Sequence, residues 1–237
     1  MRLIHFTDLH LQTSQMHAVR AICDKECPDL VAITGDIMLF SSEKAAAEQM
    51  PLVQRFLEEL QRDFPVAFCS GNHEYYSRDH AFGPLSLFCA DGQSKRLTRA
   101  GVTVQVTSFP FDPTFAALPD VLAVEKQNMG FAHKRIWLHH EPPLRSATGW
   151  NGDSYQGNPI LPMLLKQETP DYLLCGHIHD APFSGGRTSE AMHGVMCCNP
   201  GATEGQFEFA EQPPYILIDL KSDDVVWHGP VFSVAKP

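Results

Sequence analysis

The chain has 237 residues, of which 43% are hydrophobic and 19% charged, an ordinary composition for a soluble globular protein. This length suffices for one full hydrophobic core, so residues 1–237 are predicted to form a single domain. The formal net charge of −10 argues against a general nucleic-acid binder, which needs a basic surface for the phosphates. It does not exclude an anionic substrate, because bound divalent metal ions can reverse the local charge.

The cysteines and the apolar runs bear on the compartment. Seven cysteines without a Cys-x-x-Cys pair indicate reduced, mostly buried thiols, as is usual in the cytoplasm. No apolar run approaches the roughly 18 residues of a membrane span, and the amino terminus lacks the layout of a signal peptide. We therefore expect a cytoplasmic protein without membrane association. The sequence leaves its oligomeric state open.

The first 70 residues predict alternating strands and helices. Each strand is a short run rich in branched and aromatic residues, and the run from Asp29 to Thr34 is apolar enough to be buried on both faces. Strand–helix–strand–helix–strand order predicts a parallel sheet with right-handed crossovers. The predicted strands comprise residues 2–7, 29–34 and 65–69, and the helices comprise residues 17–26 and a long segment capped by Ser41 or Ser42.

The remaining chain predicts more strands, one helix and two loops. Residues 109–120 contain three prolines and are predicted to be a loop, and residues 145–159, rich in Gly, Ser and Asn, a long surface loop. Further strands are predicted at residues 101–108, 135–138, 171–175, 195–198, 215–220 and 225–228, and a helix at residues 160–166.

Five predicted strands end in side chains that can bind metal ions. Because the carboxyl ends of strands meet at one edge of an open α/β sheet, these side chains are expected to converge. Carboxylate, amide and imidazole donors together suit a divalent transition metal such as manganese, iron or zinc. In order, the strand ends carry Asp8 and His10; Asp36; Asn72 and His73; His139 and His140; and His177 and His179.

Two of the strand-end motifs are rarely expected by chance, namely Gly-Asn-His at residues 71–73 and Gly-His-x-His at residues 176–179. Their glycines suit a backbone that turns sharply beside a metal. With the preceding Asp-x-His and Gly-Asp and the intervening His-x-Pro, the series resembles the calcineurin-like metallophosphoesterase family over residues 8–179. The Asn-Pro-Gly turn at residues 199–201 also resembles bacterial members. The resemblance implies a four-layer α/β/β/α sandwich with two metal ions between the sheets.

The resemblance also implies a role for each residue. Asp36 would bridge the two ions, which suits a carboxylate because its charge limits their repulsion. His73 would bind no metal and would act as general acid on the leaving group, a role worth roughly 10²–10⁴ in rate. The His-x-Pro pattern selects His140 as ligand, with its neighbour His139 as the alternative, because adjacent residues of an extended segment point to opposite sides. Asp8, His10 and His179 would bind one ion, and Asn72, His140 and His177 the other.

The function implied by the resemblance is hydrolysis of a small phosphomonoester or phosphodiester, with a hydroxide between the two metals as nucleophile and Asp36 and His73 as catalytic residues. Gly35-Asp36 lacks the downstream Asp-Arg-Gly of protein phosphatases, which argues against phosphoproteins as dedicated substrates. The alternatives are a catalytically silent scaffold and a nuclease. The presence of all expected ligands argues against the scaffold, and the short acidic chain argues against the nuclease. Solvated surface roles are expected for Tyr75, Tyr76, Arg78, Trp150, Asn151 and Arg187.

Overall fold

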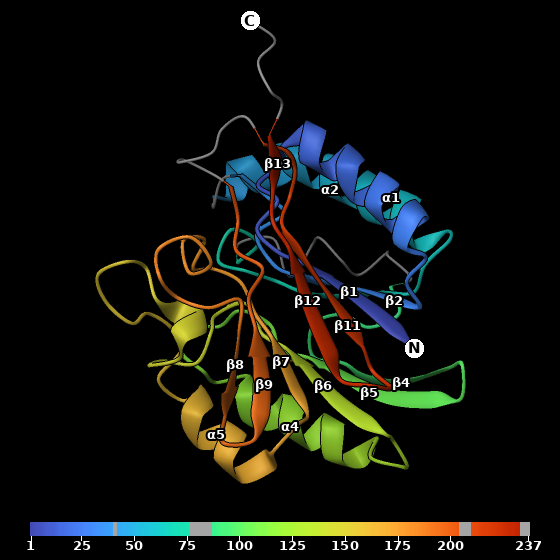
Figure 1. The fold of residues 1–237 in the computed structure, drawn as a ribbon, viewed down its shortest axis with the longest axis vertical. Coiled ribbons are helices and arrows are strands. Elements are labelled where there is room, and N and C mark those ends of the chain that lie inside the picture. Colours follow the sequence, from blue (N-terminus) through green and yellow to red (C-terminus); the bar gives the residue numbers. More distant parts are fainter. Residues whose placement is uncertain (40–41, 76–86, 204–209, 233–237) are drawn as a thin grey trace, which may run out of the picture.

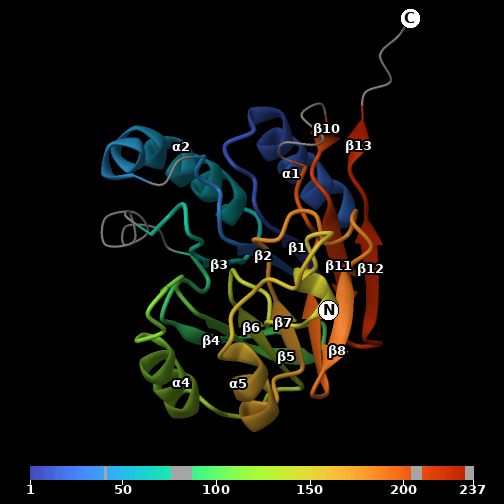
Figure 2. The same ribbon diagram turned by 90° about the vertical axis from the view of Figure 1, so that its left-hand side faces the viewer.

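Two β-sheets lie face to face between two layers of helices (Figures 1 and 2). In the computed structural model of the chain, residues 1–39, 42–75, 87–203 and 210–232 are described. Within them, α1 (Thr13–Glu26) and α2 (Glu43–Gln61) cover the first sheet, and α4 (Leu118–Gln127) and α5 (Leu161–Glu168) cover the second. This arrangement confirms the predicted α/β/β/α sandwich.

The first sheet combines parallel and antiparallel strands. Its central strands β1, β2 and β3 are parallel, as predicted from the strand–helix alternation, whereas β11 runs antiparallel to β1. Alternate residues serve different layers: Ile4 and Phe6 pack under the helices, and Leu3 packs against the other sheet. The strand order is β12 (Asp224–His228), β11 (Tyr215–Asp219), β1 (Arg2–Phe6), β2 (Leu30–Thr34) and β3 (Val66–Cys69).

The second sheet repeats this alternation. On β6, Trp137 packs under the helices, while Ile136 and Leu138 face the first sheet. The strand order is β4 (Ser94–Arg99), β5 (Val102–Ser108), β6 (Lys134–Leu138), β7 (Tyr172–Leu174), β9 (Val195–Cys198) and β8 (Ser189–Met192). A separate pair joins β10 (Ala210–Gln212) and β13 (Val231–Phe232), and a 3-10 helix, η1, spans Ala147–Gly149.

Three predictions about local structure were wrong. Helix α1 begins at Thr13, four residues before the predicted start, and buries Gln15. Helix α4 begins inside the predicted loop 109–120, because a proline in the first turn of a helix costs no hydrogen bond. The predicted surface loop 145–159 is partly internal, with Ser146, Thr148 and Asn158 buried, since these polar side chains find hydrogen-bond partners inside the protein.

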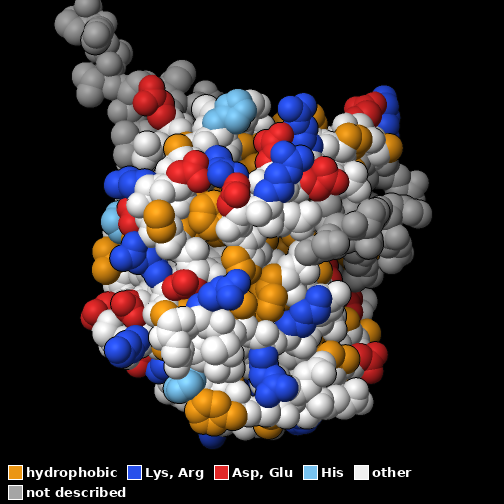
Figure 3. Space-filling view, turned by 90° about the vertical axis from the view of Figure 1, so that its right-hand side faces the viewer, with side chains coloured by type: hydrophobic (Ala, Val, Ile, Leu, Met, Phe, Trp, Pro, Cys, Tyr) orange, Lys and Arg blue, Asp and Glu red, His pale blue; other side chains and the backbone are white. Residues whose placement is uncertain are grey.

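The burial of the cysteines and the charges on the surface can be compared with what the sequence predicts. All seven cysteines are free, and all but Cys27 are buried, which confirms the predicted buried thiols. On the face shown in Figure 3, acidic and basic side chains are interspersed. Of the helices that the structure describes, none has the length and apolar character needed to cross a membrane.

Candidate metal centre

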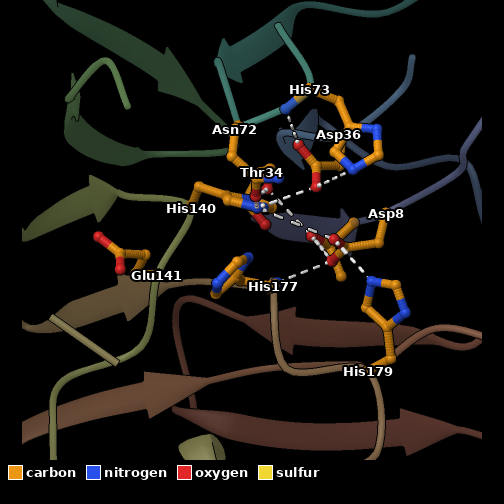
Figure 4. A network of polar contacts seen from close by, with 12 residues as sticks. Asp8, Thr34, Asp36, Asn72, His73, His140, Glu141, His177 and His179 are labelled. Carbon is orange, nitrogen blue, oxygen red and sulfur yellow. Dashed lines mark hydrogen bonds and ion pairs between the residues drawn. The ribbon is translucent and has the colours of Figure 1, made fainter. Parts of the chain in front are cut away.

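The eight predicted site residues lie together where the carboxyl ends of five strands from both sheets meet, and Figure 4 labels all of them except His10. The first sheet contributes the turns after β1, β2 and β3, and the second sheet those after β6 and β7. The sites are therefore built from segments far apart in sequence. The turns carry Asp8 and His10; Asp36; Asn72 and His73; His140; and His177 and His179.

Asp8, His10 and His179 form the first group of donors. Their ligand atoms lie within 4.8 Å of one another. His179 Nε2 is 3.2 Å from Asp8 Oδ1 and 3.3 Å from His10 Nε2. His10 Nδ1 lies 3.1 Å from the carbonyl oxygen of Met38, to which it can only donate, so Nε2 is left to face the group.

Asp36, His140 and His177 form the second group, with donor atoms again within 4.8 Å of one another. His140 Nδ1 donates to the carbonyl oxygen of Thr34 at 2.7 Å, which turns Nε2 toward the centre. That Nε2 atom is 3.3 Å from Asp36 Oδ2 and 3.1 Å from Asn72 Oδ1. Asn72 therefore adjoins this group, as the resemblance implies.

Asp36, a member of the second group, also lies close to His10 of the first group. It also forms a third group of donors with His10 and His73. Its Oδ1 accepts the backbone N–H of His73 at 2.9 Å, and its Oδ2 faces His140. Such a position suits the predicted bridging role, which stays a prediction.

Two buried carboxylates give the centre a negative potential. Burial opposes their ionisation, but the imidazoles of His179, His140 and His10 hold the pKa of Asp8 well below its usual value, and His140 lowers that of Asp36. Burial likewise opposes the charging of His140, yet Asp36 and Asp8 raise its pKa to about 10. A divalent cation can take the place of that proton. The donor set and its charge therefore fit metal ions.

Several donors sit in strained backbone. Asp8, His10, Asp36 and His177 have φ angles of 51°, 44°, 50° and 65°, in the left-handed region that costs of order 1–3 kcal/mol for such residues. Hydrogen bonds between the β1 and β2 turns hold this geometry. The N–H of Asp8 donates to the Gly35 carbonyl at 3.1 Å, and that of His10 to the Asp36 carbonyl at 2.9 Å. Strain of this kind is typical of functional sites.

The motif glycines are required mainly by close approach. A Cβ atom on Gly71 would lie 2.1 Å from Asp36 Oδ1, and one on Gly176 would lie 1.8 Å from Thr7 Oγ1. Gly35 has both constraints, a φ of +83° and a Cβ position 2.6 Å from the Gly71 nitrogen. Of these three glycines only Gly35 has a positive φ, while Gly71 and Gly176, for which the sequence predicted a sharp turn, let neighbouring turns touch.

Unlike His140 and His177, His73 and His139 do not belong to the second group of donors. His73 Nε2 lies 3.8 Å from Asp36 Oδ2, and its side chain is 25% exposed, so a substrate can reach it. His139 is buried, its Nδ1 bonds the Glu141 backbone, and burial lowers its pKa to about 4. It belongs to none of the three donor groups found among the described residues. The structure thus places His140, and not its neighbour, in the cluster.

A family model for calcineurin-like phosphoesterases matches residues 1–181. The chain belongs to the calcineurin-like phosphoesterase family. This membership confirms the resemblance found in the sequence, and the family is metal-dependent, in keeping with the donor groups. A search of curated proteins found no match.

Solved structures of similar fold span almost the whole chain of this calcineurin-like phosphoesterase. The first is TT1561 of Thermus thermophilus, with a TM-score of 0.63 and 14% identity over 96% of this chain and 98% of the other. The second is a dimetal phosphatase from Danio rerio, with a TM-score of 0.59 and 12% identity over 98% and 96%. The third is an archaeal phosphodiesterase, with a TM-score of 0.52 and 14% identity over 96% and 99%. These likenesses show the fold.

Sequence reasoning missed the residues that support the donors. Glu74 is buried and accepts backbone N–H groups from two turns; burial and the charge of Asp36 raise its pKa to about 7, while those N–H groups act in the opposite direction. Asn199 Nδ2 lies within 3.3 Å of the carbonyl oxygens of Gly176 and Ile178, which flank His177. Glu74 directly follows the Gly-Asn-His motif and Asn199 begins the Asn-Pro-Gly turn, and these positions were the only signal that pointed to them.

Of the residues for which a solvated surface role was expected, some are exposed and others are half-buried. Tyr75 was expected to be solvated but is half-buried, with its ring 6.2 Å from that of Phe111. The Phe111 ring in turn lies 6.2 Å from that of His140, so an aromatic pair borders the centre. Asn151 and Arg187 are exposed, Trp150 is half-buried with its indole N–H donating to Ser184, and Tyr76 and Arg78 lie outside the described residues.

Proposed function

We propose that this calcineurin-like phosphoesterase hydrolyses a small phosphomonoester or phosphodiester, using two divalent metal ions such as manganese, iron or zinc. The observation that supports the proposal most is that Asp36 belongs to two donor groups, one with His140 and His177 and one with His10, which is also a member of the group with Asp8 and His179. When bound, the ions would polarise the phosphoryl oxygens and lower the pKa of water. A cytoplasmic location fits the free thiols and is part of the proposal.

The protein residues would hold the ions and limit the negative charge around the substrate. Asp8, His10 and His179 would hold one ion, and Asn72, His140 and His177 the other, with Asp36 shared. Asn72 is neutral, so it adds an oxygen donor without a charge that would repel the phosphate. The carbonyl of Thr34 would keep the proton of His140 on Nδ1, leaving Nε2 as the donor.

His73 would act as the general acid. Its Nε2 faces Asp36 at 3.8 Å, and the partial exposure of the ring lets a leaving group approach it. In the proposed reaction, Nε2 gives its proton to the ester oxygen that departs. The backbone N–H of the same residue donates to Asp36 Oδ1, so the acid and the shared ligand are positioned together.

The test combines metal analysis of the purified protein with hydrolysis of aryl phosphomonoesters and phosphodiesters in added manganese. We expect bound transition metal, manganese-stimulated hydrolysis, loss of both in Asp36→Ala, and a loss of rate with retained metal in His73→Ala. His193→Ala, which changes a histidine outside the centre, is the control and should match the unmodified protein. Bound metal without activity would favour a silent scaffold, and the absence of both metal and activity would refute the proposal.

A further inference from the structure

Glu74 is a buried carboxylate that connects the β2 and β3 turns. Its side chain is completely buried directly after His73. Oε2 accepts the backbone N–H groups of Asp36 and Gly71, and Oε1 accepts that of Met38, each at 2.8 Å. One side chain thus satisfies three backbone donors from two strand ends.

Only a carboxylate can make all three of these bonds. A glutamine at this position would direct its NH₂ group at one of the N–H donors, leaving a buried donor opposite another donor. A negative charge buried close to Asp36 is unfavourable by itself, because the two carboxylates repel each other and both lose their hydration. The sequence nevertheless places glutamate here, where its acceptors match the N–H groups of the two turns.

The turns that Glu74 holds lead to both donor groups. The Asp36 residue that it fixes through the backbone N–H carries the shared carboxylate. Met38 donates its backbone N–H to Glu74, and the carbonyl oxygen of the same residue lies 3.1 Å from His10 Nδ1. Gly71, the third partner, immediately precedes Asn72. A change at this one carboxylate would therefore shift donors of both groups.

We propose that Glu74 is a positioning residue, which sets the spacing of the β2 and β3 turns and thereby the affinity of the centre for its metal ions. The proposal rests on the metal-binding part of the proposed function and does not depend on the substrate. Glu74 itself touches no substrate and binds no metal; it acts through Asp36, Met38 and Gly71.

The test measures manganese binding by calorimetric titration of the metal-free protein. Glu74→Gln should bind manganese about 10–100-fold more weakly, the usual effect of losing a partner behind a metal ligand. Glu125→Gln is the matched control: Glu125 is also buried, but it accepts from Trp137 Nε1 under α4, away from the centre. It should lose stability and keep its manganese affinity.

A second variant, Glu74→Asp, and an assay of phosphoester hydrolysis complete the test. Glu74→Asp retains the charge but is shorter, so it should also weaken binding, and it replaces the glutamine variant if that does not fold. Unchanged affinity in a folded Glu74 variant, or an equal loss in Glu125→Gln, would overturn the proposal, as would wild-type protein that binds no manganese. Wild-type protein that binds manganese without hydrolysing any phosphoester would overturn the proposed function only.

Discussion

Replacing Gly35 by alanine tests whether the close contact between the β2 and β3 turns governs stability. The backbone at Gly35 has a φ of +83°, which costs a non-glycine residue about 1–2 kcal/mol. The added Cβ would also lie 2.6 Å from the Gly71 nitrogen and 2.7 Å from His140 Nδ1. Relieving such a clash in a packed region costs typically about 1–3 kcal/mol. We expect Gly35→Ala to lower the free energy of unfolding by roughly 2–5 kcal/mol.

Gly194→Ala separates the two contributions. Gly194 has nearly the same φ, +85°, but a Cβ there would meet no atom within 4 Å, so only the backbone term of about 1–2 kcal/mol applies. Urea unfolding of both variants in chelator, followed by circular dichroism, measures the difference without a contribution from metal. If both variants lose the same free energy, the clash at Gly35 is not the cause and the reasoning fails.

Three further predictions concern metal, thiols and acid. Manganese at 100 times its dissociation constant should add about 2.7 kcal/mol to the free energy of unfolding, so chelation should lower the melting temperature of the wild type and leave Asp36→Asn unchanged. In the folded protein only the exposed Cys27 thiol should react quickly with a disulfide reagent, because burial raises the pKa of the other thiols, that of Cys23 to about 12. The rapid reaction should be absent in Cys27→Ser, and rapid reaction of several thiols would contradict the prediction. Burial lowers the pKa of His5 to about 3, below its unfolded value of 6.5. As the pH falls below 6.5, the unfolded chain takes up a proton that the folded protein does not, so the free energy of unfolding should fall by about 1.4 kcal/mol per pH unit. Between pH 6.5 and 4 this free energy should depend less steeply on pH in His5→Gln than in the wild type, and an unchanged slope would contradict the prediction.

The buried strands and the edge strand β12 could be read from the sequence, whereas other peripheral strands such as β4 could not. β2 and residues 136–138 of β6 are apolar runs because both of their faces are covered, which is the pattern that identifies a central strand. β4, by contrast, exposes Lys95 and Arg96 at the edge of its sheet, and it becomes a strand only by pairing with β5. Its local sequence carries no such pattern.

The candidate donors could be predicted because two of the strand-end motifs are rare by chance and the whole series resembles one family, whereas the residues that support the donors could not. Asp36 and His140 were assigned to the centre through the resemblance to the family. Glu74 and Asn199 act on backbone atoms of other turns, and such contacts exist only after the turns have come together. The partly buried position of Tyr75 likewise depends on Phe111, which belongs to a distant segment.

The division of donors between two sheets has a consequence for the order of folding. Asp8 and His179, whose side chains meet at 3.2 Å, are separated by 171 positions and belong to different sheets. Neither predicted ion would find its full set of ligands in one half of the chain, so high-affinity capture must wait until the halves have docked. Metal uptake during refolding would then report the last assembly step, and chelated protein would be most prone to open along the seam between the sheets.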